Sequence, residues 1–237
     1  MYSLSVLLQE LNVPFQRLGQ KTDDHFQRIA SIKKADKHSL IFIHKADENT
    51  KEILNKGSFS VVLLDEEWGR KLVDQLNCLN AAIFLVKQPR TAFAQILRRL
   101  YPQEDFFNKS IHPSAIIHPE AHIHPTVSIG RHCEIGKCSI GENSRIDAYT
   151  IVNDNVVIGK NVIIREYCLI GGCGFGIVRS VNGDLTRIPH IGGVIIEDDV
   201  EIFPHVSVDR ATLDETIIKK GTKIDNYCHI GHNSTIG

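Results

Sequence analysis

The chain has 237 residues, of which 42% are hydrophobic and 23% charged, a composition that excludes a disordered or collagen-like protein and fits one or two soluble domains. Its 27 Lys and Arg residues against 28 Asp and Glu residues give a formal net charge of -1, so there is no overall basic field to hold nucleic acid or an anionic membrane. No apolar run approaches the roughly 18 residues of a membrane-spanning helix, and the N-terminus lacks the basic segment of a signal peptide, so we expect a cytoplasmic protein without a transmembrane segment.

The first 105 residues predict a small α/β domain. Two segments have the apolar spacing of helices, and three short apolar runs have the length of strands. The helical segments are 3–11 and 91–100, and the strand segments are 39–44, 59–64 and 81–86.

No nucleotide-binding loop of a standard kind is present in this domain, because neither GxGxxG nor GxxxxGK[ST] occurs in it. A polar segment, 103–110, leads to a second domain, which we expect to span 106–237.

Aliphatic residues recur every six positions in the second domain. Eleven of them follow one another with a single five-residue step, and seven more continue in a second register. The first set is Ile111, Ile117, Ile123, Ile129, Ile135, Ile140, Ile146, Val152, Ile158, Ile164 and Ile170, and the second is Ile196, Ile202, Val208, Ile218, Ile224, Ile230 and Ile236.

A period of six matches neither a 3.6-residue helix nor simple strand alternation, but it matches a short strand and a turn repeated three times per coil. The repeat therefore predicts a triangular prism in which residues 18 apart stack and the aliphatic side chains fill the axis. Eighteen such repeats make about six coils. In a β-sandwich, the six-residue spacing of the aliphatic residues would have to arise by chance, so the prism is the favoured fold.

Two segments interrupt the repeat. Residues 171–193 are rich in glycine and predict a long loop that leaves the prism wall, with freedom for positive φ. Residues 208–216 form a compact, charged insertion. Both precede the polar segment 223–233, KIDNYCHIGHN.

Three histidines six residues apart, His112, His118 and His124, invite comparison with a metal site. In a three-sided prism this spacing places them at successive corners, so they cannot converge on one ion. Each is followed by proline, which favours turns, and we interpret these histidines as structural. The six cysteines contain no CxxC pair and favour buried thiols over disulfides or zinc ligands. They are Cys78, Cys133, Cys138, Cys168, Cys173 and Cys228.

A cluster of polar residues surrounds His232 late in the prism. An imidazole beside a carboxylate and amides is what general-base catalysis needs, although the spacing alone favours an ordinary surface histidine. No Ser, Cys or Lys stands in a nucleophile motif, so a covalent acyl-enzyme is not indicated. The cluster contains Asp225, Asn226, His229, His232 and Asn233.

The hexads, the GFG loop followed by RIPHIGGVIIEDDVEI, and the segment VDRATLDETIIKKGTKIDNYCHIGHNSTIG resemble the UDP-3-O-(3-hydroxyacyl)glucosamine N-acyltransferases of lipid A synthesis. The resemblance spans nearly the whole chain. It implies a left-handed parallel β-helix, a homotrimer with active sites between subunits, and a uridine-binding N-terminal domain. It also implies a 3-hydroxyacyl donor on acyl carrier protein, a UDP-amino sugar as acceptor, and no metal or cofactor.

The resemblance assigns roles to single residues. His232 matches the catalytic base, and Phe42 matches an aromatic that stacks on uracil, although a core residue of an apolar strand is an equal reading for Phe42. The cluster around His232 would bind substrate: Asn226 and Asn233 would hold the sugar or orient the imidazole, with Asp225 and His229 beside them.

Several positions depart from the family pattern. Cys173 replaces Asp, His190 replaces Gln, and Phe203-Pro204 replaces Ile-Gly-Ala. The family's second uracil-stacking aromatic is missing, and Glu48 stands near its place. The chain also stops at Gly237, whereas the family continues with coils that supply an oxyanion amide and a further histidine, so the β-helix is expected to be incomplete at its C-terminus.

Two classes of function follow. The first is an N-acyltransferase acting on the 2-amine of a UDP-3-O-acyl-glucosamine, or on a different nucleotide-amino sugar given the changes at Cys173, His190 and Glu48. The second is a truncated or impaired relative that binds a UDP-sugar as a trimeric scaffold.

Overall fold

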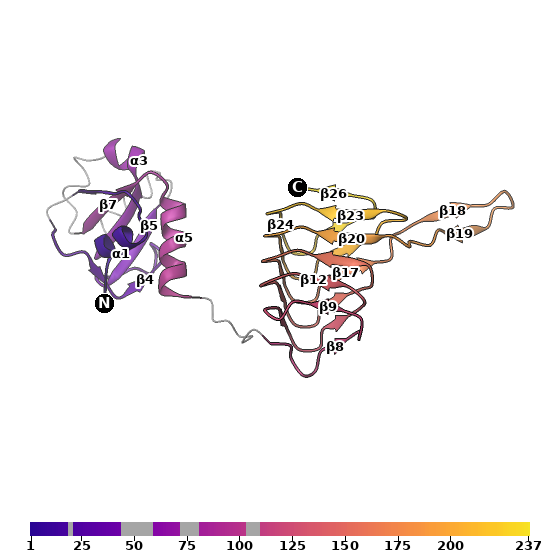
Figure 1. Ribbon diagram of the computed structural model, residues 1–237. Coiled ribbons are helices and arrows are strands. Elements are labelled where there is room, and N and C mark those ends of the chain that lie inside the picture. Colours follow the sequence, from indigo (N-terminus) through magenta and orange to yellow (C-terminus); the bar gives the residue numbers. More distant parts are fainter. Residues whose placement is uncertain (19–20, 44–58, 72–80, 103–109) are drawn as a thin grey trace. The chain divides into compact units, whose positions relative to one another are not determined.

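The computed structural model describes residues 1–18, 21–43, 59–71, 81–102 and 110–237. Contacts divide the chain into two compact units, Met1–Glu104 and Asp105–Gly237, each with its own hydrophobic core (Figure 1). Among the described residues, no helix is long and apolar enough to cross a membrane.

The first unit is an α/β fold built on one mixed sheet. Its elements are β1 (Tyr2–Ser3), α1 (Leu4–Glu10), β2 (Gln16–Leu18), β3 (His25–Phe26), β4 (Arg28–Ile29), β5 (Ser39–Ile43), β6 (Val61–Asp65), α3 (Glu66–Lys71), β7 (Ala82–Val86) and α5 (Pro89–Leu100).

The main sheet has the order β2-β7-β6-β5-β4, in which β4 to β7 run parallel and β2 runs antiparallel to β7. Apolar side chains are buried on both faces of this sheet. One cluster joins Leu63 and Phe84 to the helices, and a second, separate cluster contains Val62 and Ile83. Burial on both faces explains why these strands are continuous apolar runs rather than alternating ones.

The expected elements of this unit are present with small shifts at their ends. The three predicted strands appear as β5, β6 and β7, and the two predicted helices as α1 and α5. Helix α5 begins at Pro89, two residues earlier than its apolar spacing indicates, because proline is well tolerated in a first helical turn. His44, the last residue of one predicted strand, lies outside the described residues.

The second unit is a parallel β-solenoid with seventeen short strands in its walls. They are β8 (Ile116–Ile117), β9 (His122–Ile123), β10 (Ser128–Ile129), β11 (Glu134–Ile135), β12 (Ser139–Ile140), β13 (Arg145–Ile146), β14 (Ile151–Val152), β15 (Val156–Ile158), β16 (Ile163–Ile164), β17 (Leu169–Gly172), β20 (Gly193–Ile196), β21 (Glu201–Ile202), β22 (Ser207–Asp209), β23 (Glu215–Ile218), β24 (Lys223–Ile224), β25 (His229–Ile230) and β26 (Thr235–Ile236).

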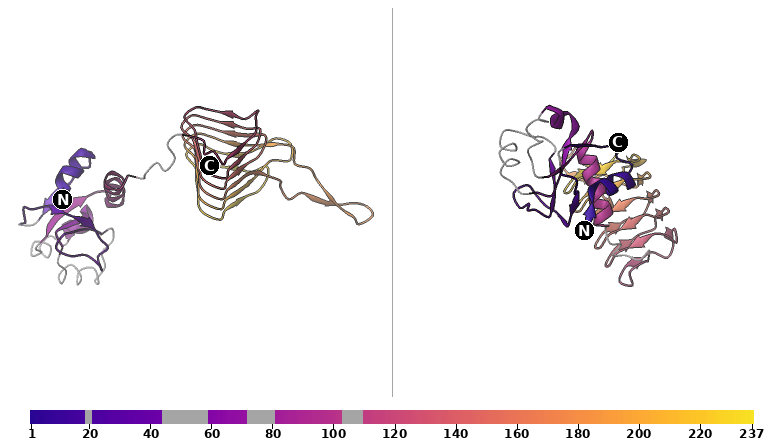
Figure 2. Two further views of the ribbon diagram at one scale, coloured as in Figure 1. Left: turned by 90° about the horizontal axis from the view of Figure 1, so that it is seen from below. Right: turned by 90° about the vertical axis from the view of Figure 1, so that its left-hand side faces the viewer.

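Three parallel sheets form the walls, in the orders β10-β13-β16-β21-β24, β8-β11-β14-β17-β22-β25 and β9-β12-β15-β20-β23-β26. Every third strand therefore pairs, as the six-residue repeat predicts, and Figure 2 shows the coils stacked on one another. The predicted prism is confirmed, and it is a left-handed parallel β-helix.

The repeated aliphatic residues stack in register along the axis. Ile146 pairs with Ile164 and Ile164 with Ile202, and all three are fully buried. The side chains of the first and last coils, such as Ile111 and Ile236, are more exposed than those of the middle coils. The solenoid core therefore depends on stacking of successive coils.

The glycine-rich interruption is a hairpin that leaves the wall between β17 and β20. Its strands, β18 (Ile177–Arg179) and β19 (Leu185–Arg187), pair antiparallel and project from the coils (Figures 1 and 2). The chain leaves the wall at Gly171, with φ of 81°, and turns at the hairpin tip at Gly183, with φ of 89°. Positive φ at both positions explains the need for glycine there.

One line of turns carries stacked aromatic rings rather than Asn or Gly. Neighbouring ring centroids are 4.9 to 5.2 Å apart, and each residue has a positive φ. Stacking offsets the cost that a left-handed conformation imposes on a bulky side chain. The rings belong to His132, Tyr149, Tyr167, His205 and Tyr227.

The cysteines of the solenoid are free thiols. Cys133, Cys138 and Cys168 are buried, as the sequence predicts, whereas Cys173 is exposed and Cys228 is half-buried. Cys78 lies outside the described residues.

Burial should make these thiols differ in reactivity. Desolvation raises the pKa of Cys138 and of Cys168 to about 11. At pH 8 only about one part in a thousand of each is thiolate, the form that reacts with alkylating agents. We expect iodoacetamide to label Cys173 first, as read by peptide mass mapping, and labelling of Cys138 or Cys168 at a comparable rate would contradict the buried core.

Candidate functional site

Polar side chains meet where the β18–β19 hairpin leaves the solenoid beside its later coils. His232 and Asn233 lie in the turn after β25, and Asn233 has a φ of 60°. His232 is half-buried. The charged insertion contributes Thr212, and the return of the hairpin contributes His190.

Asn233 fixes the orientation of His232. The backbone N–H of Thr212 donates to Asn233 Oδ1 at 2.9 Å, so the amide nitrogen faces the other way. That nitrogen donates to Thr212 Oγ1 at 3.1 Å and lies 2.7 Å from His232 Nδ1. Asn233 is therefore in direct contact with the imidazole, and its role in catalysis stays a prediction.

The same contact assigns the proton of the neutral imidazole. An amide nitrogen can only donate, so His232 Nδ1 accepts and the ring carries its proton on Nε2. A proton reaches Nδ1 only when the Asn233 contact opens, whereas Nε2–H is ready to donate.

His190 packs against His232 at this point. Their ring centroids are 4.6 Å apart with an interplanar angle of 72°, an edge-to-face arrangement. A methyl group on Gly174 would lie 2.7 Å from His190 Nε2 and 2.8 Å from His232 Cδ2. Only glycine therefore leaves room for both rings, which accounts for the GFG loop.

His229 belongs to a second polar pair near the same turn. Its Nε2–H donates to Asp209 Oδ2 at 2.9 Å, and Asp209 is buried whereas His229 is exposed. Asp209 pairs with Gly172 across a register shift between β17 and β22. Asp209 therefore contacts both, pairing with the start of the hairpin through its backbone and with His229 through its carboxylate.

Two other predicted residues lie apart from these contacts. Asp225 and Asn226 are exposed, and Asp225 Oδ1 accepts the backbone N–H of Asn226 at 2.9 Å. No hydrogen bond of the described residues joins them to His232. Their place in a substrate site remains a prediction.

Phe42 lies on β5 of the first unit. Its ring stacks on Phe93 with centroids 4.6 Å apart and an interplanar angle of 9°, and it packs half-buried against the core. The structure therefore shows the core contact, and uracil stacking by this ring stays a prediction. Glu48, which stands near the place of the family's second uracil-stacking aromatic, lies outside the described residues.

The regular histidines lie at turns, as expected. The ring nitrogen Nδ1 of His112, His118 and His124 accepts the backbone N–H two residues later in each case, at 3.1 to 3.3 Å. These contacts place the three imidazoles in the hydrogen bonding of their own turns.

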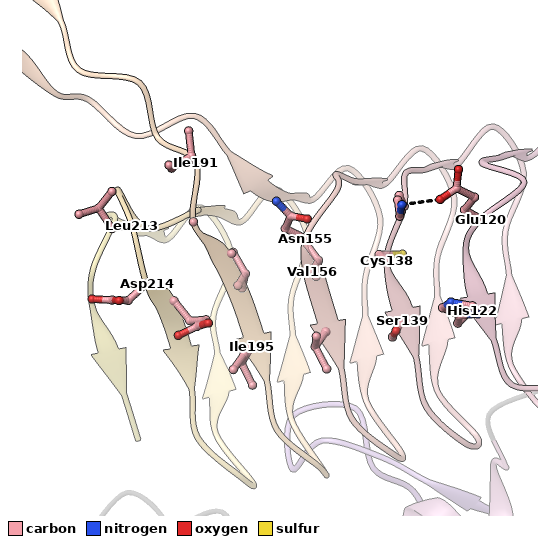
Figure 3. Close-up of a pocket in the computed structure, with 16 residues that line it drawn as sticks. Glu120, His122, Cys138, Ser139, Asn155, Val156, Ile191, Ile195, Leu213 and Asp214 are labelled. Carbon is pink, nitrogen blue, oxygen red and sulfur yellow. Dashed lines mark ion pairs between the residues drawn. The ribbon is translucent and has the colours of Figure 1, made fainter.

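A shallow groove of about 450 Å³ runs along the sheet that contains β9, β12, β15, β20 and β23 (Figure 3). Ile191 and Leu213 stand at one end of it, and Glu120 and Lys137, which form an ion pair, stand at the other. Ile191 directly follows His190, and Leu213 directly follows Thr212, so the groove begins beside the His232 site.

Several residues of the site could not be selected from sequence alone. His190 stands out in sequence only as a departure from the family pattern, and Asp209 and Thr212 only as members of a charged insertion. The fold brings them together because the hairpin returns to the wall over that insertion: Thr212 O accepts the Ile191 N–H, and Gly193 O accepts the Ala211 N–H.

Comparisons with known proteins agree with this architecture. Residues 137–172 match the family model of bacterial transferase hexapeptide repeats. The UDP-3-O-acylglucosamine N-acyltransferase of Coxiella burnetii is 31% identical over 100% of this chain and 71% of its own length. The enzyme of the same name from Prochlorococcus marinus is 36% identical over 88% of this chain and 64% of its own.

Among solved structures, LpxA from Acinetobacter baumannii is 26% identical, with a TM-score of 0.45, over 52% of this chain and 46% of that one. The match to the Coxiella protein over the full length of this chain, with the hexapeptide solenoid, places the chain in the UDP-3-O-acylglucosamine N-acyltransferase family.

Proposed function

We propose that this protein is an N-acyltransferase that moves a 3-hydroxyacyl chain from acyl carrier protein to the 2-amine of a UDP-3-O-acyl-glucosamine in lipid A synthesis. The observation that carries the proposal is the oriented imidazole of His232, held by Asn233 beside the hairpin in a family member matched along its whole length. The reaction belongs to the cytoplasm, and the free thiols of the solenoid support that placement.

The chemistry needs one proton acceptor. The amine nitrogen attacks the thioester carbonyl carbon, the new C–N bond forms, and His232 takes the amine proton. The tetrahedral intermediate then expels the thiolate, which recovers the proton from the imidazolium. In this structure His232 accepts at Nδ1, so the incoming amine takes the place of the Asn233 amide there.

The surroundings supply binding surface for both substrates. His229, exposed on β25 just before the His232 turn, can hydrogen-bond the sugar, and the groove offers Ile191 and Leu213 to the acyl chain. Asn226 is exposed at the preceding turn and would contribute a further amide. Phe42 would present the ring face opposite Phe93 to uracil. No metal or cofactor enters this scheme.

A homotrimer is the assembly we propose. The hairpin exposes a set of large apolar side chains that a monomer leaves in water, and such surfaces mark protein contacts. Among them are Phe175, exposed to 80%, and Leu185, exposed to 64%. Covering them with a neighbouring copy would also enclose the His232 site.

Analytical ultracentrifugation tests this assembly. We expect three chains per particle at micromolar concentration, and a shift to smaller species when Phe175 and Leu185 are both changed to Ser. Exposed Ser180→Ala serves as the matched hairpin control and should leave the particle unchanged. A wild-type monomer would contradict the trimer.

The activity itself is tested by turnover. The 237-residue chain is incubated with 3-hydroxyacyl-carrier protein and UDP-3-O-acyl-glucosamine, and UDP-sugar binding is measured separately by calorimetry. Turnover with release of free carrier thiol supports the transferase. Tight UDP-sugar binding without turnover would instead identify a scaffold.

A further inference from the structure

His190 has a buried nitrogen without a partner. The side chain is only 7% exposed, and its Nδ1 lies 3.1 Å from the carbonyl oxygen of Ile188. A carbonyl can only accept, so Nδ1 carries the proton and Nε2 of the neutral ring is an acceptor. Among the described residues, this Nε2 is the one buried side-chain nitrogen or oxygen without a hydrogen bond.

Buried polar groups are almost always hydrogen-bonded, so an exception calls for an explanation. A purely structural residue at this position would do better with an apolar side chain, which leaves no acceptor unpaired. A functional role therefore explains a histidine at position 190 better than a structural role does.

The neighbouring imidazole has the complementary group. His232 accepts at Nδ1 from Asn233, which leaves its proton on Nε2, and its Cδ2 edge lies beside Gly174 together with His190 Nε2. Gly174 and Gly176 both pack against the His190 ring, since an added Cβ at either position would lie within 2.8 Å of it. One histidine thus offers a buried acceptor and the other an adjacent donor.

We propose that His190 is a positioning residue for His232, accepting the Nε2–H of His232 on its own Nε2 in the working site. Asn233 holds Nδ1 until the amine takes its place, and His190 keeps the Nε2 edge of the His232 ring fixed while the amine occupies Nδ1. When His232 takes the amine proton at Nδ1 it becomes an imidazolium, and the neutral His190 ring beside it stabilises that charged form. The inference rests on the proposed acyl transfer by His232.

Two substitutions separate acceptor chemistry from packing. His190→Gln keeps an acceptor oxygen on a side chain of similar length, whereas His190→Leu keeps volume and removes the acceptor. We expect His190→Leu to lower kcat by about 10- to 100-fold, the usual loss for a group that supports a catalytic residue, with little change in KM. His190→Gln should recover most of that loss. His112→Gln, in the first coil, is the matched control and should behave as wild type.

Thermal unfolding distinguishes this role from a structural one. Leu removes the unpaired acceptor but also the donor to the Ile188 carbonyl, and these two effects oppose each other, so His190→Leu should change Tm little while it loses activity. Parallel losses of Tm and activity in both His190 variants would overturn the proposal.

The hydrogen bond is also observable without any activity. In protein labelled with ¹⁵N-histidine, the two imidazole ¹⁵N shifts of His232 report which nitrogen carries the proton, and ¹⁵N–¹⁵N coupling to His190 reports the N–H···N bond. We expect the proton on Nε2 and a coupling that His190→Leu abolishes, in the free or the UDP-sugar-bound protein. A proton on Nδ1, or no coupling in either state, refutes the pair. Failure of turnover with the coupling present would instead refute the proposed function.

Discussion

Replacing His232 by Ala should reduce N-acylation by about 10²- to 10⁴-fold, the usual worth of a positioned proton acceptor. Binding of the UDP-sugar should change little, since the imidazole acts on the amine proton rather than on the nucleotide. Initial rates with 3-hydroxyacyl-carrier protein measure the first effect, and calorimetry measures the second.

His112→Ala is the control for this substitution, because it removes an imidazole from the first coil, where Nδ1 serves only its own turn. Its rate should match that of the wild type. Equal and substantial turnover in His232→Ala and wild type would show that another group takes the proton.

The second large effect is expected in the solenoid core. Ile164 is fully buried on β16, paired with Ile146 on one side and Ile202 on the other. Ile164→Ala should lower the free energy of unfolding by about 2 to 5 kcal/mol, because it leaves a cavity that stacked coils cannot close. Urea unfolding followed by circular dichroism, at one protein concentration, measures the change.

Ile151→Ala is matched in residue type and lies in the same region of the solenoid, but its side chain points outward and is 37% exposed. Its cost should be clearly smaller than that of Ile164→Ala. Similar costs at the two positions would contradict the inward and outward assignment of the repeat.

The sequence predicts the solenoid well because the same packing contact between aliphatic residues is repeated in every coil. Each aliphatic residue, such as Ile158, meets the same residue type one coil away, so the six-residue phase determines the pairing. The hairpin at 171–193 is marked by its glycines, but its strands β18 and β19 are not, since their side chains are exposed on both faces and carry no period.

The site is less predictable because its contacts cross from one interruption to another. His232 and Asn233 stand out as a polar pair, but the tautomer of His232 depends on the orientation of the Asn233 amide, which is set by the backbone N–H of Thr212, 21 residues before Asn233. His190 meets His232 only because the hairpin returns over the later coils. The spacing of these residues in the sequence does not predict either contact.

The most direct measurement of the central claim compares two acceptors that differ only at the reacting nitrogen. The chain is supplied with 3-hydroxyacyl-carrier protein and either UDP-3-O-acyl-glucosamine or its N-acetylated counterpart, and products are read by mass spectrometry. Our account predicts that the free amine gains one 3-hydroxyacyl group as an amide and that the N-acetylated sugar gains none. Acylation of both acceptors, or of neither while both substrates bind, would contradict it.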